Sequence, residues 1–201
     1  MTFSINEFNS AILKRGGIQS TNRFLVTMTP PPALFAGGNY NSISRDMEFW
    51  CSATNLPGYQ IATHAAKRWT YGPDEKRPFT PIYQPVNLRF NADNNGDYLR
   101  FFNSWLQFIM PHDWYNSFNS TETKYPSQNG GKGQYDLEYK LNYATDITIA
   151  TFAQSGSLVS IYILKEAFPV AVSDEEFDWE RQSDKQTFTV NIEYLDWVEK
   201  N

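Results

Sequence analysis

The sequence predicts a mainly β protein, with a β-barrel or sandwich of two antiparallel sheets and one flanking α-helix. Three observations support this class. Several segments alternate apolar and polar residues with the period of two that half-buried strands show. One stretch, residues 97–109, switches to helical spacing. The chain also holds 15 Phe, 12 Tyr and 6 Trp, and this aromatic content is typical of strands that pack large surfaces together.

Length, charge and cysteine count narrow the possible functions. The 201 residues fit a single domain, 1–201, with an N-terminal arm at 1–21 and loop insertions at 30–45 and 113–134. The net charge of −5 argues against a general nucleic-acid-binding protein, which needs clustered Lys and Arg. Cys51 is the single cysteine, so we expect a core residue and no intrachain disulfide. The sequence shows neither a transmembrane-length apolar run nor a signal-peptide pattern, so we expect no membrane association and no general secretion.

The first strand is expected after the N-terminal arm. Residues 1–21 are polar with scattered Phe and Ile, as in a flexible arm or a short helix. Alternation over Phe24–Met28 predicts a strand, which Pro30–Pro32 must end because proline has no backbone N–H to donate. Residues 33–44 are expected to form a loop.

Further strands are expected on both sides of an exposed turn. One face of a second strand is predicted to hold Met47, Phe49, Cys51 and Ala53. Residues 60–71 are compatible with a third strand, and Gly72–Pro78 has the composition of a turn. A further strand is predicted from the alternation of Val86, Leu88 and Phe90 with polar residues.

The one predicted helix spans Asp97–Ile109. Asp97 is a favourable N-cap residue, and Pro111 stops the helix. Its apolar stripe consists of Leu99, Phe102, Trp105, Leu106 and Ile109, widened by Phe101 and Phe108. We expect this stripe to pack onto the sheets, with Trp105 as a core anchor.

A single long strand is predicted after an exposed loop at 115–134. Over Leu137–Thr151, one face would hold Leu137, Tyr139, Leu141, Tyr143, Ile147 and Ile149. At about 3.3 Å per residue this strand would span roughly 50 Å. A compact domain of this length measures about 40 Å across, so the strand must bend or project.

The C-terminal region predicts a hairpin and a closing strand. Ser155–Gly156 can turn the hairpin, and Leu158–Leu164 is apolar on both faces, like a strand buried between layers. The Phe168–Pro169 step is expected to break this strand. Apolar residues then alternate from Phe188 to Tyr194 and change phase at Leu195 and Trp197. That slip predicts a bulge or a strand that moves from one sheet to another.

No catalytic, cofactor or metal site is predicted. His64 and His112 lack carboxylate partners at fixed spacing, and the glycine run at 130–133 lacks the spacing of a phosphate-binding loop. An acidic cluster comprises Asp174, Glu175, Glu176, Asp178 and Glu180. It favours a solvated surface, although paired carboxylates would also suit a glycosidase. A carbohydrate-active β-sandwich enzyme is therefore the alternative from a different class.

The segment from Lys67 to Tyr83 is predicted to be a contact arm that reaches an adjacent subunit. Its aromatic residues lie among prolines and mixed charges, a composition that suits protein interfaces. The candidate contact residues are Lys67, Arg68, Tyr71, Asp74, Lys76, Arg77, Phe79 and Tyr83. Further along the chain, Phe177, Trp179 and Phe188 are predicted to be core anchors.

Three segments, in order, resemble the tail tube subunits of contractile-tailed bacteriophages. Asn22–Met28 looks like the opening strand of that family, and Phe49–Pro57 looks like its strand running into an Ala-Thr-x-Leu-Pro turn. The C-terminal signature is an apolar-Pro step, then Phe177-Asp178-Trp179, then a Gln-Thr-Phe-x-Val strand starting at Gln186. Each motif alone occurs in other β proteins, but the ordered set covers most of the chain.

The resemblance implies a structural virion protein rather than an enzyme. In that family, six subunits form a ring, rings stack into a tube, and each subunit lends about four strands to an inner barrel. About 24 strands spaced 4.8 Å apart and tilted by about 40° give a lumen of roughly 35–40 Å. The implied partners are further copies of the chain and the sheath, baseplate and terminator proteins. A baseplate tube-initiator or tube-completion protein of the same fold is an alternative.

The same resemblance places the protein in the phage tail, assembled in the host cytoplasm, with DNA passing through the lumen without specific binding. Because the chain is acidic, we expect a neutral-to-acidic lumen that repels duplex DNA. The polar faces of the long strands would form its wall. Glu138, Asp146 and Glu193 are the lumen-facing candidates.

Overall fold

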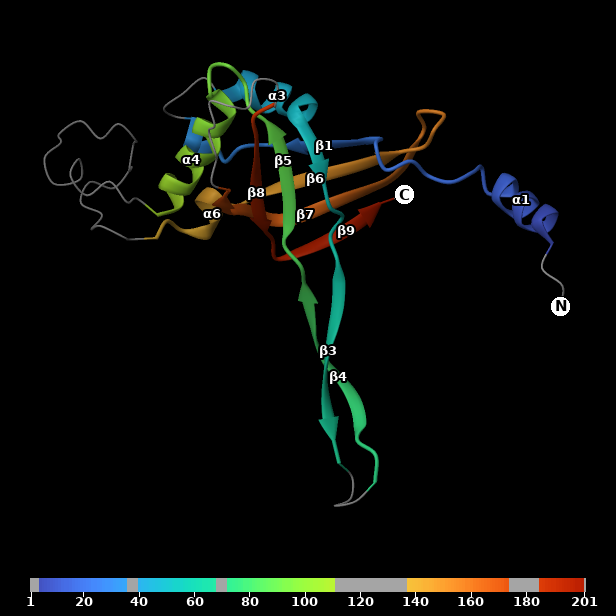
Figure 1. Ribbon diagram of the computed structural model, residues 1–201. Coiled ribbons are helices and arrows are strands. Elements are labelled where there is room, and N and C mark those ends of the chain that lie inside the picture. The colour runs from blue at the N-terminus through green and yellow to red at the C-terminus, as the bar shows by residue number, and fades with distance from the viewer. Residues whose placement is uncertain (1–3, 36–39, 68–71, 111–136, 174–184, 201) are drawn as a thin grey trace, which may run out of the picture.

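The computed structural model of the protein describes residues 4–35, 40–67, 72–110, 137–173 and 185–200 (Figure 1). Its strands are β1 (Phe24–Met28), β2 (Cys51–Thr54), β3 (Tyr59–Ala66), β4 (Glu75–Tyr83), β5 (Val86–Asn91), β6 (Thr145–Phe152), β7 (Leu158–Val172), β8 (Thr187–Glu193) and β9 (Asp196–Lys200). Its helices are α1 (Ile5–Lys14), α2 (Pro32–Phe35), α3 (Tyr40–Trp50), α4 (Asp97–Ile109) and α6 (Lys140–Tyr143). Within these residues, no helix has the length and apolar character needed to cross a membrane.

Seven strands form two antiparallel layers that share β7. Sheet A consists of β1, β6, the first half of β7 and β9. Sheet B consists of the second half of β7, then β8, β5 and β2. The strands of the two layers cross each other (Figure 1), as in orthogonal packings whose corner strands pass from one sheet to the other. The predicted mainly β class with two antiparallel sheets is confirmed, but the described strands do not close into a barrel.

A matched kink lets two paired strands change sheets together. Glu166 has a backbone φ angle of +50°, which residues other than glycine rarely adopt. At this residue β7 turns from sheet A into sheet B. Register is kept across the kink, because Leu164 pairs with Trp197 and Phe168 pairs with Glu193. Between them, the Leu195 N–H donates to the Lys165 carbonyl at 3.0 Å. The phase slip predicted near Leu195 is thus a strand moving between sheets.

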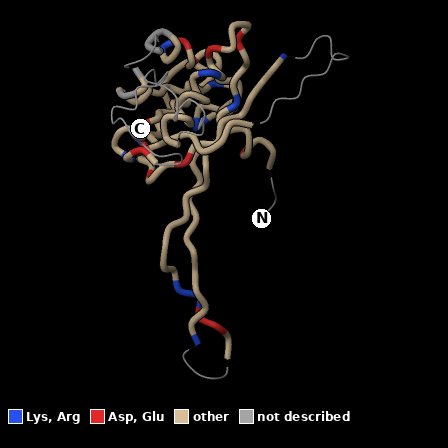
Figure 2. Tube along the Cα trace, turned by 90° about the vertical axis from the view of Figure 1, so that its left-hand side faces the viewer, with Lys and Arg blue, Asp and Glu red and all other residues tan. Residues whose placement is uncertain are grey.

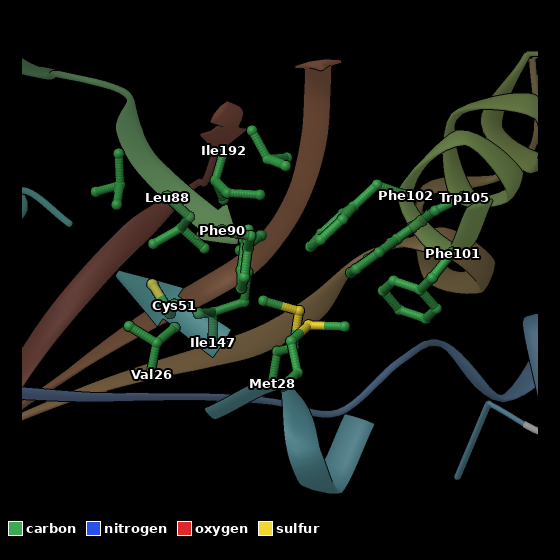
Figure 3. Packing of buried hydrophobic residues seen from close by; sticks show 14 of the residues in the cluster. Val26, Met28, Cys51, Leu88, Phe90, Phe101, Phe102, Trp105, Ile147 and Ile192 are labelled. Atoms are coloured by element: carbon green, nitrogen blue, oxygen red, sulfur yellow. The ribbon is translucent and has the colours of Figure 1, made fainter. Parts of the chain in front are cut away.

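The core lies between the two sheets and helix α4 (Figure 3). Phe90, Phe102 and Phe188 form an aromatic centre, with Phe90 centroids 5.1 Å from Phe102 and 5.7 Å from Phe188. These three side chains are at most 1% exposed. Burial of an apolar side chain of this kind contributes roughly 1.5–3 kcal/mol, so this centre is a main source of stability. Phe188 is therefore a core anchor, as predicted.

Helix α4 has the predicted bounds but a different cap and buried face. Asp93, rather than Asp97, caps the helix: its carboxylate accepts the backbone N–H groups of Asp97 at 3.1 Å and Tyr98 at 3.3 Å. The left-handed conformation of Gly96, with φ 69°, brings Asp93 back over this first turn. The fully buried face consists of Tyr98, Phe101, Phe102, Ser104 and Trp105, while the predicted Leu99, Leu106 and Ile109 are partly exposed.

The predicted loop at 33–44 and the predicted strand from Met47 are wrong. The described residues of these segments form α2 and α3, and only Cys51–Thr54 is strand, while residues 36–39 lie outside the described residues. Met47 is 1% exposed but Phe49 is 75% exposed. Neighbours two apart lie on opposite sides of a helix, so these two residues do not share a face. Cys51 is buried, as predicted.

The single strand predicted over Leu137–Thr151 is also wrong. Its first half leads into the short helix α6, and β6 has only eight residues. The apolar side chains of Leu137, Tyr139 and Leu141 are exposed, so the alternation there does not mark a buried face. The expected length of roughly 50 Å therefore does not apply.

Pro169 does not break β7 as predicted. The strand continues to Val172, and Pro169 is buried opposite Ile192. A register shift lies between Pro169 and Ala171. Among the described strands, only β8 pairs with this half of β7, so one edge is unpaired. Proline is tolerated at bulges and on edge strands, because fewer ladder hydrogen bonds are required there.

Candidate assembly surface

Strands β3 and β4 form a two-stranded hairpin that projects far from the two sheets (Figure 1). They pair only with each other, from Tyr59 opposite Tyr83 at the root to Ala66 opposite Glu75 near the tip. Nearly all of their side chains are exposed or half-exposed. An isolated two-stranded hairpin is marginally stable in water. The hairpin has a root, where Tyr59 lies opposite Tyr83, a stem over residues 59–66 and 78–83, and a tip with residues 67 and 72–77.

The root is tied to the sheets by the side chain of Asn55. Its Oδ1 accepts the Asn87 N–H at 2.6 Å, and its Nδ2 donates to the Pro85 carbonyl at 3.3 Å. These bonds join the chain leaving β2 to the chain entering β5. Asn55 thus holds the two ends of the hairpin together where they leave sheet B.

Three tyrosines also support the root. The ring of Tyr83 lies 5.9 Å from Tyr59 and 6.0 Å from Tyr194, centroid to centroid. The Tyr194 hydroxyl donates to the Gln84 carbonyl at 2.8 Å. A hydrogen bond to the Asp196 carboxylate raises the pKa of Tyr83 above its ordinary value, with smaller contributions from desolvation and nearby negative charge. Tyr194, between β8 and β9, and Asp196, the first residue of β9, therefore help to orient the hairpin.

The stem is uncharged and partly apolar. From Tyr59 to Ala66 and from Pro78 to Tyr83 the chain contains no Lys, Arg, Asp or Glu (Figure 2). Its exposed large apolar side chains are Tyr59, Ile61, Phe79 and Ile82. Tyr59, Ile61, Phe79 and Pro81 also line a shallow depression on the stem. Exposed apolar surface of this kind, next to polar residues, is typical of protein interaction sites.

The charges of the hairpin are concentrated near its tip (Figure 2). Lys67 and Asp74 form an ion pair at 3.5 Å, and Arg77 and Glu75 form another at 3.1 Å. All four side chains are at least 43% exposed. Such exposed pairs contribute little to stability, so the tip is better suited to orientation and specificity than to holding the strands together.

The structure places most predicted contact residues on this hairpin. Lys67, Asp74, Lys76 and Arg77 lie near the tip. Phe79 is on the stem and Tyr83 at the root, while Arg68 and Tyr71 lie outside the described residues. Sequence analysis missed Tyr59, Ile61 and Ile82. A usable signal was the alternation of large apolar residues with small or polar ones in 59–63.

The three lumen candidates lie on different elements. Asp146 on β6 forms an ion pair with Lys165. Glu193 is exposed on β8. Glu138 precedes α6 and accepts a hydrogen bond from Asn142 at 2.8 Å, so its expected place on a strand face is wrong.

The remaining predicted residues are not part of a described site. Phe177, Trp179 and the acidic cluster at 174–180 lie outside the described residues, as does His112. His64 is on β3, with its ring centroid 6.0 Å from that of Phe79. Among the residues that the structure describes, no group of His, Cys, Asp and Glu could hold a metal ion.

The described residues thus combine two crossed antiparallel sheets, a flanking helix and a projecting hairpin whose stem exposes apolar side chains. The profile of the family described as "phage tail tube protein" matches residues 19–200. The chain belongs to this phage tail tube protein family. This result confirms the resemblance and the prediction of a tube-type structural protein rather than an enzyme. No curated protein sequence gives a significant match.

Solved structures with the same fold come from contractile injection systems. A chain of the anti-feeding prophage baseplate, symmetrised six-fold, aligns with a TM-score of 0.56 at 11% identity over 91% of this chain and 95% of that chain. A chain of an extracellular contractile injection system sheath-tube complex gives 0.51 at 14% identity over 99% of both chains. The tube-terminating cap of the anti-feeding prophage gives 0.52 at 13% identity over 91% of both chains.

Proposed function

We propose that six copies of this chain form a ring, and that stacked rings form the inner tube of a contractile phage tail. The tube is the conduit for DNA during ejection. Family membership supports this role, and the observation that carries it is the projecting hairpin. Its stem exposes Tyr59, Ile61, Phe79 and Ile82, and among the described residues no strand outside the hairpin pairs with it. A neighbouring subunit would bury this surface.

The hairpin provides the contact with the adjacent subunit or ring. The apolar stem supplies buried area, and the charged tip, with Lys67, Asp74, Lys76 and Arg77, sets register and orientation. The contact role of Arg68 and Tyr71 follows from their place in the same hairpin sequence. Asn55 and Tyr194 fix the direction of the hairpin, so that less conformational entropy is lost when subunits join.

The assembled tube resides in the virion, as part of the tail, and is built in the host cytoplasm. Its partners are the sheath around it, the baseplate below it and the terminator that ends it. The chain acts as one tube domain over 1–201, with residues 1–21 as an arm. The solved structures of similar fold, taken from a sheath-tube complex, a baseplate and a cap, favour this set of partners.

A tube-initiator or tube-completion role is the second candidate. The baseplate and cap chains match the fold as well as the tube chain does, with TM-scores of 0.56, 0.52 and 0.51. Self-assembly separates the two roles. A tube subunit should polymerise into long tubes alone, whereas an initiator or cap should stop at single rings or short stacks.

Negative-stain imaging of the purified protein tests the proposal, with six-fold rings and tubes as the expected result. Deleting Gly72–Pro78, or changing both Tyr59 and Phe79 to Ser, should leave a folded protein that forms no tubes. Leu141→Ser is the matched control, because Leu141 is 94% exposed but lies on α6. Tubes of normal length and yield from both hairpin variants would rule out the hairpin as the contact.

A further inference from the structure

We propose that the apolar stem of the projecting hairpin is covered by helix α1 of a second copy of the chain. This inference rests on the proposed function, because it names the segment that fills one contact between subunits. It follows from two exposed apolar surfaces that lie outside the sheets, from their sizes, and from the charges at their ends.

Helix α1 is amphipathic, but none of its residues is buried in its own subunit. Ile5, Phe8 and Ile12 recur at positions i, i+3 and i+7, so they share one face of the helix, here called the α1 stripe. Ile5 is 64% exposed and Phe8 is 51% exposed. The opposite face holds Glu7 and Lys14. A helix of ten residues is marginally stable in water by itself, so the α1 stripe requires an apolar surface to pack against.

Local hydrogen bonds and two glycines fix the end of α1. The Gly17 N–H donates to the Ile12 carbonyl at 3.0 Å, and the Gly16 N–H donates to the Leu13 carbonyl at 3.1 Å. This pair of bonds is a Schellman motif. Gly16 has a φ angle of 80° and Gly17 one of 96°, which residues other than glycine rarely adopt. The sequence therefore specifies a helix that ends before the domain begins.

A short tether joins α1 to the sheets. The Arg23 carbonyl accepts the Phe152 N–H at 3.0 Å, so the chain is fixed to β6 from this point. Residues 18–22 form the tether, which spans at most about 18 Å when fully extended. Figure 1 shows α1 to one side of the sheets and the hairpin pointing away from them in another direction. The α1 stripe and the stem therefore do not meet within one copy.

The stem offers a matching apolar surface on one of its two faces. Residues that pair directly across neighbouring strands point to the same face, and Tyr59 pairs with Tyr83 and Ile61 with Pro81. The shallow depression on this side, here called the stem face, is lined by Tyr59, Ile61, Phe79 and Pro81. Ile61 is 48% exposed and Phe79 is 67% exposed. A continuous apolar surface of this kind can receive one face of an amphipathic helix.

The two surfaces also agree in length. The ten residues of α1 measure about 15 Å along the helix axis. The eight residues of β3 span about 26 Å. One helix therefore fits along the stem without reaching the tip. It would add a third element to a two-stranded hairpin that is marginally stable alone.

The charges at the two ends are complementary in one orientation. Residues 67–77, at the tip end, contain four Lys or Arg and two Asp or Glu, a net charge of +2 (4 − 2). Glu193 and Asp196 lie exposed at the root end. Helix α1 has Glu7 in its first turn and Lys14 in its last turn. The first turn would thus point toward the tip and the last turn toward the root, with no charge on either apolar surface.

The contact joins two different surfaces of the chain, so it is heterologous. Each copy would donate one helix and accept another. Contacts of this type continue from copy to copy instead of ending at a dimer. Rings and stacks of rings require this property.

Crosslinking between two variants, each with one added cysteine, tests the contact. Phe8→Cys places a thiol on the α1 stripe, and Ile61→Cys places one on the stem face. The native Cys51 is buried, and this burial raises the pKa of its thiol to about 12, so it should not react. The two variants would be mixed, assembled into tubes and treated with a short bis-maleimide. A denaturing gel then separates single chains from crosslinked dimers.

The expected result is a dimer that contains one chain of each variant. Each variant assembled alone should not give this dimer. Phe8→Cys mixed with Asn103→Cys, on the exposed side of α4, is the matched control and should not give it either. Tubes that form normally but yield no mixed dimer would overturn the inference and leave the tube function intact.

A variant that carries both cysteines separates contact between copies from contact within one copy. A crosslink inside one chain, without any mixed dimer, would overturn the inference by showing that α1 covers its own hairpin. If the unsubstituted protein forms neither rings nor tubes, the proposed function and this inference fail together. Should Ile61→Cys prevent assembly, Phe79→Cys provides the same test, because both side chains line the stem face.

Discussion

Trp105 joins helix α4 to the rest of the domain by two kinds of contact. Its side chain is fully buried, with its ring 5.8 Å from that of Phe101. Its indole N–H donates to the Tyr143 carbonyl at 2.9 Å. We predict that Trp105→Ala lowers the free energy of unfolding by about 3–5 kcal/mol, because a large cavity is left in the core. Denaturant melts of the dissociated subunit would measure this loss.

Two further variants separate packing from hydrogen bonding at this position. Trp105→Phe keeps most of the ring contacts but leaves the Tyr143 carbonyl without its donor, so we expect a smaller loss of about 1–3 kcal/mol. Asn103→Ala, on the exposed side of the same helix, should change stability by about 0.5 kcal/mol or less. A loss below about 1 kcal/mol for Trp105→Ala would contradict the placement of this residue in the core.

Cys51 shows how burial suppresses thiol chemistry. Desolvation raises the pKa of its thiol from 9.0 to about 12, and the Sγ–H donates weakly to the Ala53 carbonyl. A folded-state pKa above the unfolded value means that this group stabilises the fold fully below pH 9. That contribution is lost as the pH rises toward 12.

We predict that Cys51 reacts slowly with thiol reagents at pH 8–9 in the native protein. The same residue should react rapidly once the chain is unfolded in denaturant, where the thiol regains its ordinary pKa. Following colour release from an aromatic disulfide reagent under both conditions measures the difference. Equal rates in the native and the unfolded protein would show that Cys51 is accessible in the folded subunit.

At the scale of single elements, the start of α4 depends on a residue outside the helix. Asp93 accepts the first two backbone N–H groups, and its negative charge interacts favourably with the helix dipole. We predict that Asp93→Ala destabilises the subunit by about 0.5–2 kcal/mol. Asp93→Asn retains an acceptor and should lose less. Thermal or denaturant melts would show no difference between these variants if the cap were unimportant.

Sequence patterns correctly predicted the elements in which buried residues recur at regular spacing along one face. Val86, Leu88 and Phe90 alternate in β5 because one face of that strand is wholly buried. Helix α4 was found because its apolar residues recur at 3.6-residue spacing between a turn and a proline. In both cases the residues that recur periodically in the sequence are the ones buried in the fold, so the pattern alone is sufficient to predict the element.

The same reasoning failed where apolar residues are exposed. Leu137, Tyr139 and Leu141 alternate as in a strand, yet all three side chains face solvent in the subunit. Met47 and Phe49 have strand spacing but lie on opposite sides of α3. A period-two pattern cannot indicate which apolar residues are buried in the subunit, so it misplaced both segments.

The sequence was sufficient to predict which residues form the candidate assembly surface, but not how they project from the domain. Turn composition and mixed charge marked the region from Lys67 to Tyr83. Its root was not recognisable, because it depends on Asn55 contacting Asn87 and on Tyr194 contacting Gln84, pairs far apart in the sequence. The lumen-facing role of Asp146 on β6 and Glu193 on β8 stays a prediction, because it depends on how the subunits assemble.

At the scale of the whole molecule, the hairpin and sheet B act together. The hairpin leaves the domain from β2 and β5, so a force on its tip is transmitted to sheet B through Asn55 and the tyrosines at its root. Rings joined by these hairpins would therefore be connected through sheet B.

The charge of the wall determines how the tube treats DNA. The chain carries a net charge of −5, so six copies carry −30 per ring (6 × −5). We predict that purified tubes do not bind duplex DNA in a salt-sensitive manner, even at low ionic strength, because no excess of Lys or Arg neutralises phosphates.

A charge-addition variant provides the positive control for this measurement. Asn191→Lys adds six cations per ring at an exposed position of β8, and should create DNA binding that weakens as salt rises. Filter binding of sheared duplex DNA to tubes of the two proteins, repeated over a salt series, measures the difference. Strong salt-sensitive binding by the unsubstituted tubes would mean a basic surface and would contradict the predicted neutral-to-acidic lumen.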